Sequence, residues 1–342
     1  MTPNGLPTVS VVLPVYNGAL YVRAAIESIL AQTFSDFELI IIDDGSTDTT
    51  AQVVTSIQDS RIIFLKQPNK GLAETLNRGI SLARGRYIAR HDHDDMSLPT
   101  RFEKQVAFLD AHPDYALLGT RSTIWVLDQP TTRGHAHPSD DALLRFELLF
   151  DCPFVHGSVM IRRDALREVG GYTTDKSRQP PEDYELWSRL IRHSKVSNLD
   201  EALLIYREVP SSITRTISFK EQLVKICAEN LSFVSEKTAL PSDIQNIAAL
   251  YHRVPELVMG KPDFKRMANL IRSAAQKVGK QSDRATTISA RAEEVISQLK
   301  WQPVLICYGR APAWLRRPIG QLRPWLSQKI PLLGRLKRRL FS

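Results

Sequence analysis

The stretch TVSVVLPVYNGALYVRAAIESILAQTFSDFELIIIDDGSTD, residues 8–48, decides the fold class of this chain. Residues 8–13 and 38–43 are short runs of apolar and β-branched residues, which predict two strands. Between them, residues 20–31 carry apolar side chains at three- and four-residue spacing, which predicts an amphipathic helix. A strand, a helix and a second strand in this order predict two parallel strands joined by a helix that packs on the sheet.

The same alternation continues as far as residue 90. Residues 61–66 and 87–90 are predicted as strands, and residues 48–57 and 71–83 as helices. We therefore expect an α/β fold with a mostly parallel central sheet that helices cover on both faces. In such sheets, ligands bind outside the carboxyl ends of the strands. Unusual polar residues follow three of the predicted strands: Tyr16 and Asn17, Asp43 and Asp44, and Asp92 to Asp95.

The rest of the chain has a different pattern. Residues 116–212 mix short strands with helices, of which 140–150 and 182–193 are the clearest, and the pattern beyond them is helical. We expect one domain at residues 1–214 and a helical C-terminal region at residues 215–342.

The positive charge of the chain is concentrated at its C-terminal end. The sequence has 45 Lys and Arg residues against 37 Asp and Glu, a net charge of +8. Nine of the basic residues and none of the acidic ones lie in residues 301–342, which leaves residues 1–300 nearly neutral. This distribution argues against a basic domain that grips nucleic acid, and we expect no nucleic-acid partner.

Cysteine content and hydropathy indicate the compartment. Cys152, Cys227 and Cys307 are too few and too scattered for a disulfide framework, which favours a reducing compartment. The N-terminal residues are interpreted as a first strand rather than a signal peptide, and no apolar run approaches the roughly 18 residues of a membrane span. We therefore expect a cytoplasmic protein.

The segment RYIARHDHDDMSLP, residues 86–99, places three aspartates directly after a predicted strand. If the pleat of the strand continues, Asp92 and Asp94 point to one side and His93 to the other. Two such carboxylates repel each other unless a cation lies between them, and oxygen ligands suit Mg²⁺ or Mn²⁺. A solvated acidic turn is the alternative. Zinc is disfavoured, because His91 and His93 are too close in sequence to Asp92 for an easy tetrahedral site.

A second acidic pair ends the strand at residues 38–43. Gly45 is expected to make the turn, and Ser46, Thr47 or Asp48 to cap the next helix. This leaves the paired aspartates at 43 and 44 unexplained. Asp44 can accept hydrogen bonds from a base or a ribose, as an acidic residue after a strand does in dinucleotide sites.

Five short motifs occur in a recognisable order: PVYN at 14–17, DDGSTD at 43–48, NKG at 69–71, DHDD at 92–95 and PEDYELW at 181–187. Together they resemble the family 2 glycosyltransferases over residues 8–214. The resemblance implies a GT-A fold, which binds a nucleotide-diphosphate sugar.

The resemblance also implies roles for individual residues. The base and ribose would be held by residues after the first two strands, and the donor would also meet Asn69 of the NKG motif. Asp92 would contact ribose and a divalent metal, Mn²⁺ or Mg²⁺, and Asp94 would be the more direct metal ligand. The implied base and ribose contacts are Pro14, Tyr16, Asn17 and Asp44.

The segment PEDYELW suits the start of a helix, since Pro and acidic residues fit a first turn. In the family that this chain resembles, the Asp of the Glu-Asp pair is the general base, which assigns that role to Asp183. A base there would deprotonate an acceptor hydroxyl for a single inverting displacement. His156 and Glu182 are acceptor-site candidates. For His156, a satisfied histidine at a strand edge is the alternative.

One position departs from the family. A Tyr-Arg-X-His segment often follows the base, and its His can complete the metal shell. Here Val209 stands at that place, although Arg207 is kept and is a candidate contact for the diphosphate. Another group or water would fill the metal position, or the metal would bind more weakly.

The C-terminal end is predicted to bind membrane. Leu332, Leu336 and Leu340 fall on one helical face among cations, which is typical of a segment that lies on an anionic membrane surface. A solvated helix or a disordered end is the alternative. A glycan or lipid-linked acceptor at the inner face of the cell membrane would suit such an anchor.

The sequence thus predicts an inverting, metal-dependent glycosyltransferase that uses a nucleotide-sugar donor, with a UDP-sugar as the default, in surface polysaccharide synthesis. A processive synthase is disfavoured because membrane spans and a Gln-X-X-Arg-Trp motif are missing from the sequence. A sugar-nucleotide nucleotidyltransferase would need a glycine-rich, Lys-bearing loop after Leu13. The alternative from another class is a non-catalytic sensor or scaffold that binds nucleotide sugars, which could dispense with Asp183.

Overall fold

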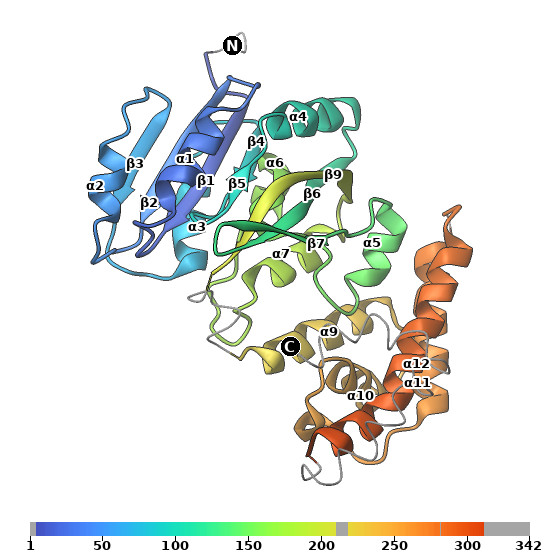
Figure 1. Ribbon diagram of the computed structural model, residues 1–342. Coiled ribbons are helices and arrows are strands. Elements are labelled where there is room, and N and C mark those ends of the chain that lie inside the picture. The colour runs from blue at the N-terminus through green and yellow to red at the C-terminus, as the bar shows by residue number, and fades with distance from the viewer. Residues whose placement is uncertain (1–4, 210–217, 281, 311–342) are drawn as a thin grey trace. The chain divides into compact units, whose positions relative to one another are not determined.

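The computed structural model describes residues 5–209, 218–280 and 282–310, with side chains as far as residue 302 (Figure 1). The chain divides into two compact units, Met1–Gln222 and Leu223–Ser342. Within the described ranges, no helix is both long enough and apolar enough to cross a membrane.

The first unit is built on one nine-stranded sheet, in the order β3-β2-β1-β4-β8-β6-β9-β5 with β7 beside β6. The four strands from β3 to β4 are parallel, as are β6 and β9, while the pairs that include β5, β7 or β8 are antiparallel. The strands are β1 (Val9–Val15), β2 (Phe37–Asp43), β3 (Ile62–Lys66), β4 (Tyr87–Arg90), β5 (Met96–Ser97), β6 (Tyr115–Val126), β7 (Gln129–His135), β8 (Met160–Arg162) and β9 (Lys195–Glu208).

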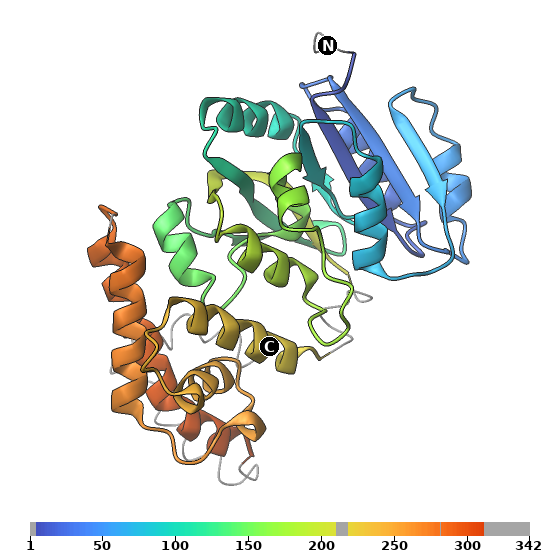
Figure 2. The same ribbon diagram turned by 180° about the vertical axis from the view of Figure 1, so that it is seen from behind.

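Helices cover both faces of this sheet (Figures 1 and 2). Apolar residues of α1, α2 and α4 share one core cluster with alternate residues of β1 and β2, such as Val11 and Leu39. On the opposite face α3 packs so closely that a Cβ at Gly79 would lie 2.4 Å from Val12. The helices of this unit are α1 (Val22–Leu30), α2 (Thr50–Thr55), α3 (Leu72–Leu82), α4 (Arg101–Ala111), α5 (Asp141–Glu147), η1 (His156–Ser158), α6 (Arg163–Glu168) and α7 (Glu182–Leu190).

The structure confirms the α/β class, with strands and helices where the spacing of apolar residues predicts them. Two local expectations were wrong. The capping position before α2 is Thr49, without a side-chain cap, because the Asp48 carboxylate instead accepts hydrogen bonds from Thr50 and from the Ala19 amide. The strand before the acidic segment ends at Arg90, so Asp92 and Asp94 lie in a turn rather than on a pleat.

The chain from residue 220 onward is helical where it is described, with α9 (Lys220–Val234), α10 (Pro241–Tyr251), η2 (Pro255–Leu257), α11 (Phe264–Gly279) and α12 (Ala285–Arg310). The buried carboxylate of Asp243 in α10 pairs with Arg266 of α11 at 2.8 Å. The predicted membrane-binding segment with Leu332, Leu336 and Leu340 lies outside the described residues.

Candidate active site

The loops that follow β1 and β2 are tied together by Asn17. Its backbone N–H donates to the Ser46 hydroxyl at 2.9 Å, and its side-chain oxygen accepts from the Thr47 amide at 2.8 Å. These bonds hold Asn17 at φ 49°, a left-handed conformation that asparagine tolerates better than most residues. The strand order reverses beside β1, so this edge is the switch point where an α/β sheet receives its ligand.

Asp44 orders a third loop at the same edge. The carboxylate is only 4% exposed and accepts hydrogen bonds from the Gln67 side chain at 2.7 Å and from the amides of Lys70 and Gly71 at 2.9 Å. The loop that carries Asn69 therefore lies against the DDGS turn. A Cβ at Gly45 would lie 2.7 Å from the Asn69 amide nitrogen, and φ at Gly45 is +81°, so both the close approach and the backbone require glycine.

Two of the predicted nucleotide contacts differ in exposure. Pro14 is buried within β1, beyond the residues that pair with β4, so its missing N–H costs no bond to that strand. Tyr16 directly follows the strand and leaves 48% of its surface exposed. An exposed aromatic ring at this edge can stack on a base.

The acidic segment forms a turn in which the Asp95 amide donates to the Asp92 carbonyl at 3.4 Å. Its carboxylates have different surroundings. Asp92 forms an ion pair with the buried Arg90. Asp94 is half-buried, and no other described residue bonds to its carboxylate. Asp95 is buried, and this burial, together with the charge of Asp94, raises its pKa to about 8.

These surroundings decide how a divalent cation could bind. Among the described residues, no three His, Cys, Asp or Glu side chains converge as a ready-made metal site. Mg²⁺ is commonly held by one or two carboxylates, with substrate phosphates and water as the other ligands. The unpaired carboxylate of Asp94 fits such a cation. Asp92 is less available, because it already neutralises Arg90.

Arg207 lies near the end of β9 and faces the acidic turn. Its amide donates to the Asp95 carboxylate at 3.0 Å, and its guanidinium donates to the Asp94 carbonyl at 3.1 Å. The same guanidinium pairs with Asp128 at 2.8 Å, and the residue is 9% exposed. Nη1 and Nη2 of Arg207 thus bond to the acidic turn and to the Met96 sulfur, while Nε is buried and contacts Asp128 as an ion pair without hydrogen-bond geometry. Val209, where the family can have a metal-binding His, is buried and apolar.

Asp183 stands in the first turn of α7, the helix that the sequence predicted to start here. Burial raises the pKa of the Asp183 carboxyl above its ordinary value, against the opposing effect of a hydrogen bond from the Tyr184 amide at 2.7 Å. The Cys152 thiol, whose own pKa is raised by burial, also donates to Asp183 across 3.7 Å. A carboxylate that burial makes more basic is suited to general base catalysis.

His156 and Glu182, the two acceptor-site candidates, lie beside each other. The His156 Nδ1 and a Glu182 carboxylate oxygen are 3.7 Å apart, and His156 Nε2 bonds to the Tyr172 hydroxyl at 2.7 Å. Burial holds the pKa of His156 well below its usual value, so the imidazole is neutral. Burial, and then the charge of Asp183, raises the pKa of Glu182 to about 7. The role of Tyr172 was missed, since nothing in its local sequence marks it.

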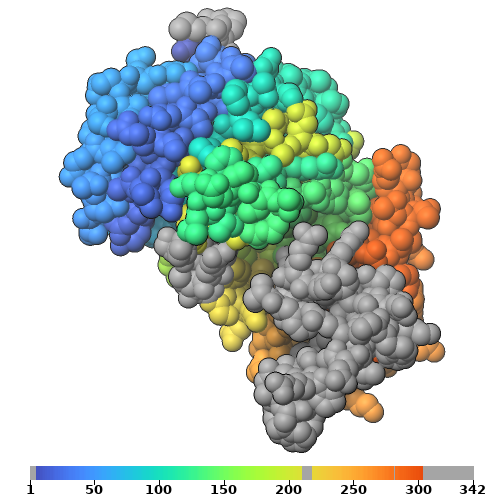
Figure 3. Space-filling model, in the orientation of Figure 1, coloured from blue at the N-terminus to red at the C-terminus, as the bar shows by residue number. Residues whose placement is uncertain are grey.

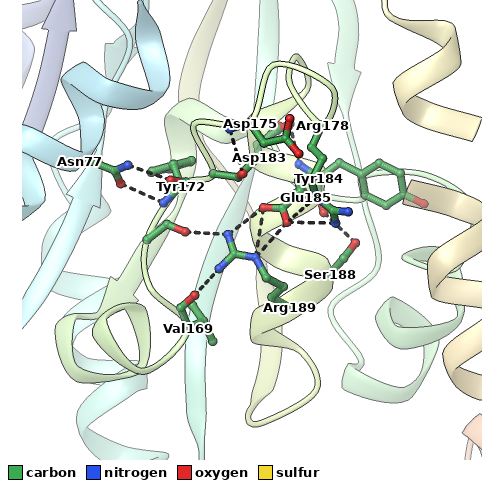
Figure 4. Close-up of polar contacts among 12 residues, drawn as sticks. Asn77, Val169, Tyr172, Asp175, Arg178, Asp183, Tyr184, Glu185, Ser188 and Arg189 are labelled. Atoms are coloured by element: carbon green, nitrogen blue, oxygen red, sulfur yellow. Dashed lines mark hydrogen bonds and ion pairs between the residues drawn. The ribbon is translucent and has the colours of Figure 1, made fainter. Parts of the chain in front are cut away.

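A buried network fixes the helix that carries Asp183 (Figure 4). The Glu185 carboxylate is paired with Arg178 and Arg189, and Arg189 also donates to the carbonyls of Val169 and Gly171. These bonds link α7 to the loop before it. Asn77 of α3 then holds Tyr172 of that loop through two hydrogen bonds, of 2.8 and 2.9 Å.

Arg90 connects the acidic turn with the base electrostatically. It is a buried cation whose charge lowers the pKa of Asp95 and Glu182, against the larger effect of burial. Gly157 lies against Arg90, its ion-pair partner Asp92 and the buried Asp95. A Cβ there would be 2.7 Å from Asp95 and 3.0 Å from Asp92, so only glycine lets η1 approach the two carboxylates this closely. A basic residue within an apolar strand was the signal in the sequence that could have identified Arg90.

Residues 10–170 match the family described as "Glycosyl transferase family 2". The "Putative glycosyltransferase EpsE" of Bacillus subtilis strain 168 is 37% identical over 281 residues, which cover 78% of this chain and 96% of that protein. An uncharacterized glycosyltransferase of Haemophilus influenzae is 31% identical over 263 residues, 72% of this chain and 81% of that one.

The fold is similar to a solved structure as well. The crystal structure of S. aureus TarS residues 1–349 with UDP-GlcNAc superposes with a TM-score of 0.57 at 16% identity, and the match covers 86% of this chain and 91% of that one. At this identity the likeness establishes the shared GT-A fold.

Proposed function

Because this chain belongs to glycosyltransferase family 2, and is therefore a glycosyltransferase with a nucleotide-sugar donor, we propose that it is an inverting, metal-dependent enzyme. The donor that we propose is a UDP-sugar, and TarS, which shares the fold, is bound to UDP-GlcNAc. The acceptor that we propose is a glycan or a lipid-linked glycan in surface polysaccharide synthesis, met by a cytoplasmic enzyme at the inner face of the membrane.

The donor site that we propose lies at the carboxyl ends of β1, β2 and β4. Tyr16 would stack on the base, and Pro14, Asn17, Asp44 and Asn69 would shape the base and ribose site. The exposure of Tyr16 and the bonds that join the three loops support this arrangement. Asp94 and Asp92 would face the diphosphate. Mn²⁺ or Mg²⁺ held by Asp94 would supply charge neutralisation for the departing diphosphate.

The observation that carries the proposal is the buried, more basic carboxylate of Asp183 beside neutral His156 and protonatable Glu182. In the reaction that we propose, Asp183 takes the proton of an acceptor hydroxyl. That oxygen attacks the anomeric carbon from the side opposite the diphosphate, so the configuration inverts. His156 and Glu182 would orient the acceptor.

Asp183→Asn tests this proposal directly. General base catalysis contributes about 10²–10⁴-fold, so we expect sugar transfer or donor hydrolysis to fall by at least 100-fold. UDP affinity, measured by calorimetry, should stay within about twofold, because Asp183 touches the acceptor rather than the nucleotide. Normal turnover by the variant would exclude Asp183 as the base. Nucleotide binding by the wild type without turnover of any donor would favour the non-catalytic sensor.

A further inference from the structure

The tip of the β6–β7 hairpin has an unusual backbone. Val126 and Gln129 are paired across the hairpin, so Leu127 and Asp128 alone make the turn. Both residues have positive φ, 50° and 57°, as in a two-residue type I′ turn. Such turns normally use Asn, Asp or Gly, and leucine there is a genuine outlier. The Leu127 side chain is 78% exposed, so its own packing does not offset the strain.

Asp128, the second residue of this turn, forms an ion pair with Arg207. Its carboxylate lies 2.8 Å from Nε of Arg207, whose guanidinium then reaches the acidic turn through the carbonyl of Asp94. The Asp128 side chain itself is 59% exposed, whereas that of Arg207 is 9% exposed. The guanidinium carbon also lies 5.5 Å above the ring of Tyr21, in the segment that follows β1.

The sheet explains why these groups meet. Arg207 is in register with Trp125 near the end of β6, which brings it beside the hairpin tip. The short strand β5, directly after the acidic turn, pairs with Leu204 and Ile205 of β9. Both the hairpin and the acidic turn are thus anchored on the same strand. In the space-filling view the green surface around the hairpin adjoins the blue surface of the N-terminal strands (Figure 3).

We propose that Asp128 and Arg207 are positioning residues for the donor: Asp128 holds the guanidinium of Arg207, and Arg207 holds the acidic turn in the conformation that receives the diphosphate. The inference rests on the donor site proposed above. It assigns Arg207 an indirect role in place of the direct contact with diphosphate that the sequence suggested.

Charge explains the need for Asp128. Asp92, Asp94 and Asp95 crowd one turn, and Arg90 already neutralises Asp92. A nearly buried Arg207 without Asp128 would turn its charge toward the unpaired carboxylate of Asp94. It would then compete with the cation and the diphosphate for that group. The ion pair with Asp128 keeps the carboxylate of Asp94 free while the guanidinium still bonds to the backbone.

Binding of UDP to the full-length protein, measured by calorimetry with and without Mn²⁺, tests the proposal. We expect Asp128→Asn to weaken UDP roughly three- to tenfold, because it removes the charge that holds Arg207. Arg207→Lys should weaken UDP at least about tenfold, since an ammonium cannot reach the partners of a planar guanidinium. The double variant should match Arg207→Lys alone, because Asp128 acts only through Arg207. In donor kinetics, KM should rise while kcat at saturating donor changes less than about twofold.

Two matched controls separate positioning from general destabilisation. Asp200 is a similarly exposed carboxylate that pairs with Arg121 at 2.8 Å, and Asp200→Asn should leave UDP affinity unchanged. Leu127→Asn keeps Asp128 and suits the positive φ, so it too should bind UDP normally.

Three results would overturn the inference: wild-type UDP affinity in Asp128→Asn, an equal loss in Asp200→Asn, or additive losses in the double variant. If Arg207→Lys does not fold, the difference in UDP affinity between Asp128→Asn and Asp200→Asn alone decides whether the inference stands. A wild-type protein that binds no nucleoside diphosphate would overturn the proposed donor site itself, whereas equal binding by all variants would overturn the positioning roles of Asp128 and Arg207 and leave the donor site standing.

Discussion

Replacing Asp44 by asparagine distinguishes a residue that orders a loop from one that only contacts nucleotide. The sequence suggests a contact with base or ribose. In the folded chain, however, both carboxylate oxygens are already bonded, to the Gln67 side chain and to the amides of Lys70 and Gly71. The variant should therefore lose stability even when no nucleotide is present.

The expected loss in the free energy of unfolding follows from the three hydrogen bonds that the Asp44 carboxylate accepts. An asparagine amide keeps one oxygen, so at least one bond is lost, an N–H then faces an N–H, and the remaining bonds lose their charge. A hydrogen bond to a charged group contributes about 1.5–3 kcal/mol and a neutral one about 1 kcal/mol. We expect the free energy of unfolding to fall by roughly 2–4 kcal/mol. For a unit of this size the Tm should fall by roughly 5–10 °C.

Thermal unfolding without nucleotide, followed by UDP titration of the folded variant, measures both effects. Asp59→Asn is the control, because Asp59 also accepts from a backbone amide and from an arginine, but in a surface turn. Its cost should stay below about 1 kcal/mol. Asp44→Asn with the Tm of the wild type and no UDP affinity would refute the loop-ordering argument and leave Asp44 as a ligand contact only.

Four further predictions concern the catalytic base Asp183, the residues that support it, and the C-terminal tail. Activity should rise with pH through an apparent pKa above the ordinary value of an aspartate, because Asp183 must be ionised to act and burial raises its pKa; a rate that falls as the pH rises through that pKa would contradict its role. Cys152→Ala should move the rise in the pH–rate profile to higher pH, since the thiol donates to the Asp183 carboxylate; an unmoved profile would show that the contact is without effect. Glu185→Gln should cost roughly 3 kcal/mol in chemical denaturation, because it leaves two arginines without their buried carboxylate; an unchanged denaturation midpoint would show that the network does not support α7. Deleting residues 312–342 should release the protein from anionic liposomes in a flotation assay, and equal binding by the truncated form would exclude the tail as the anchor.

The order of elements along β1 to β4 could be predicted because each depends on local spacing. Apolar residues at period two or at three- and four-residue intervals report which face of a strand or helix is buried. The position of Asp44 and of the acidic segment at strand ends follows directly from that pattern. The general location of the site was therefore accessible from sequence alone.

The bonding partners of the site residues could not be predicted from the spacing of apolar residues. Arg90 pairs with Asp92, Tyr172 bonds to His156, and Arg207 reaches Asp128, a residue 79 positions before it in the chain. The contacts of Tyr172 and Arg207 join segments that are distant in sequence, and the local pattern of one segment does not predict its contact with the other. The pairing of Arg90 with Asp92 depends on how the chain turns after β4. The local sequence around Tyr172 or Asp128 is that of an ordinary loop.

The acidic turn separates what the sequence determines from what only the tertiary structure decides. The sequence determined by itself that carboxylates gather after the fourth strand. Tertiary structure alone decided that the strand stops at Arg90, since β8 pairs with β4 only at Tyr87 to Ala89 and β1 only as far as Arg90. Once a strand loses its neighbours it has no reason to stay pleated, and the chain is free to turn. In that turn Asp92 neutralises Arg90, while the Asp94 carboxylate has no bonding partner among the described residues.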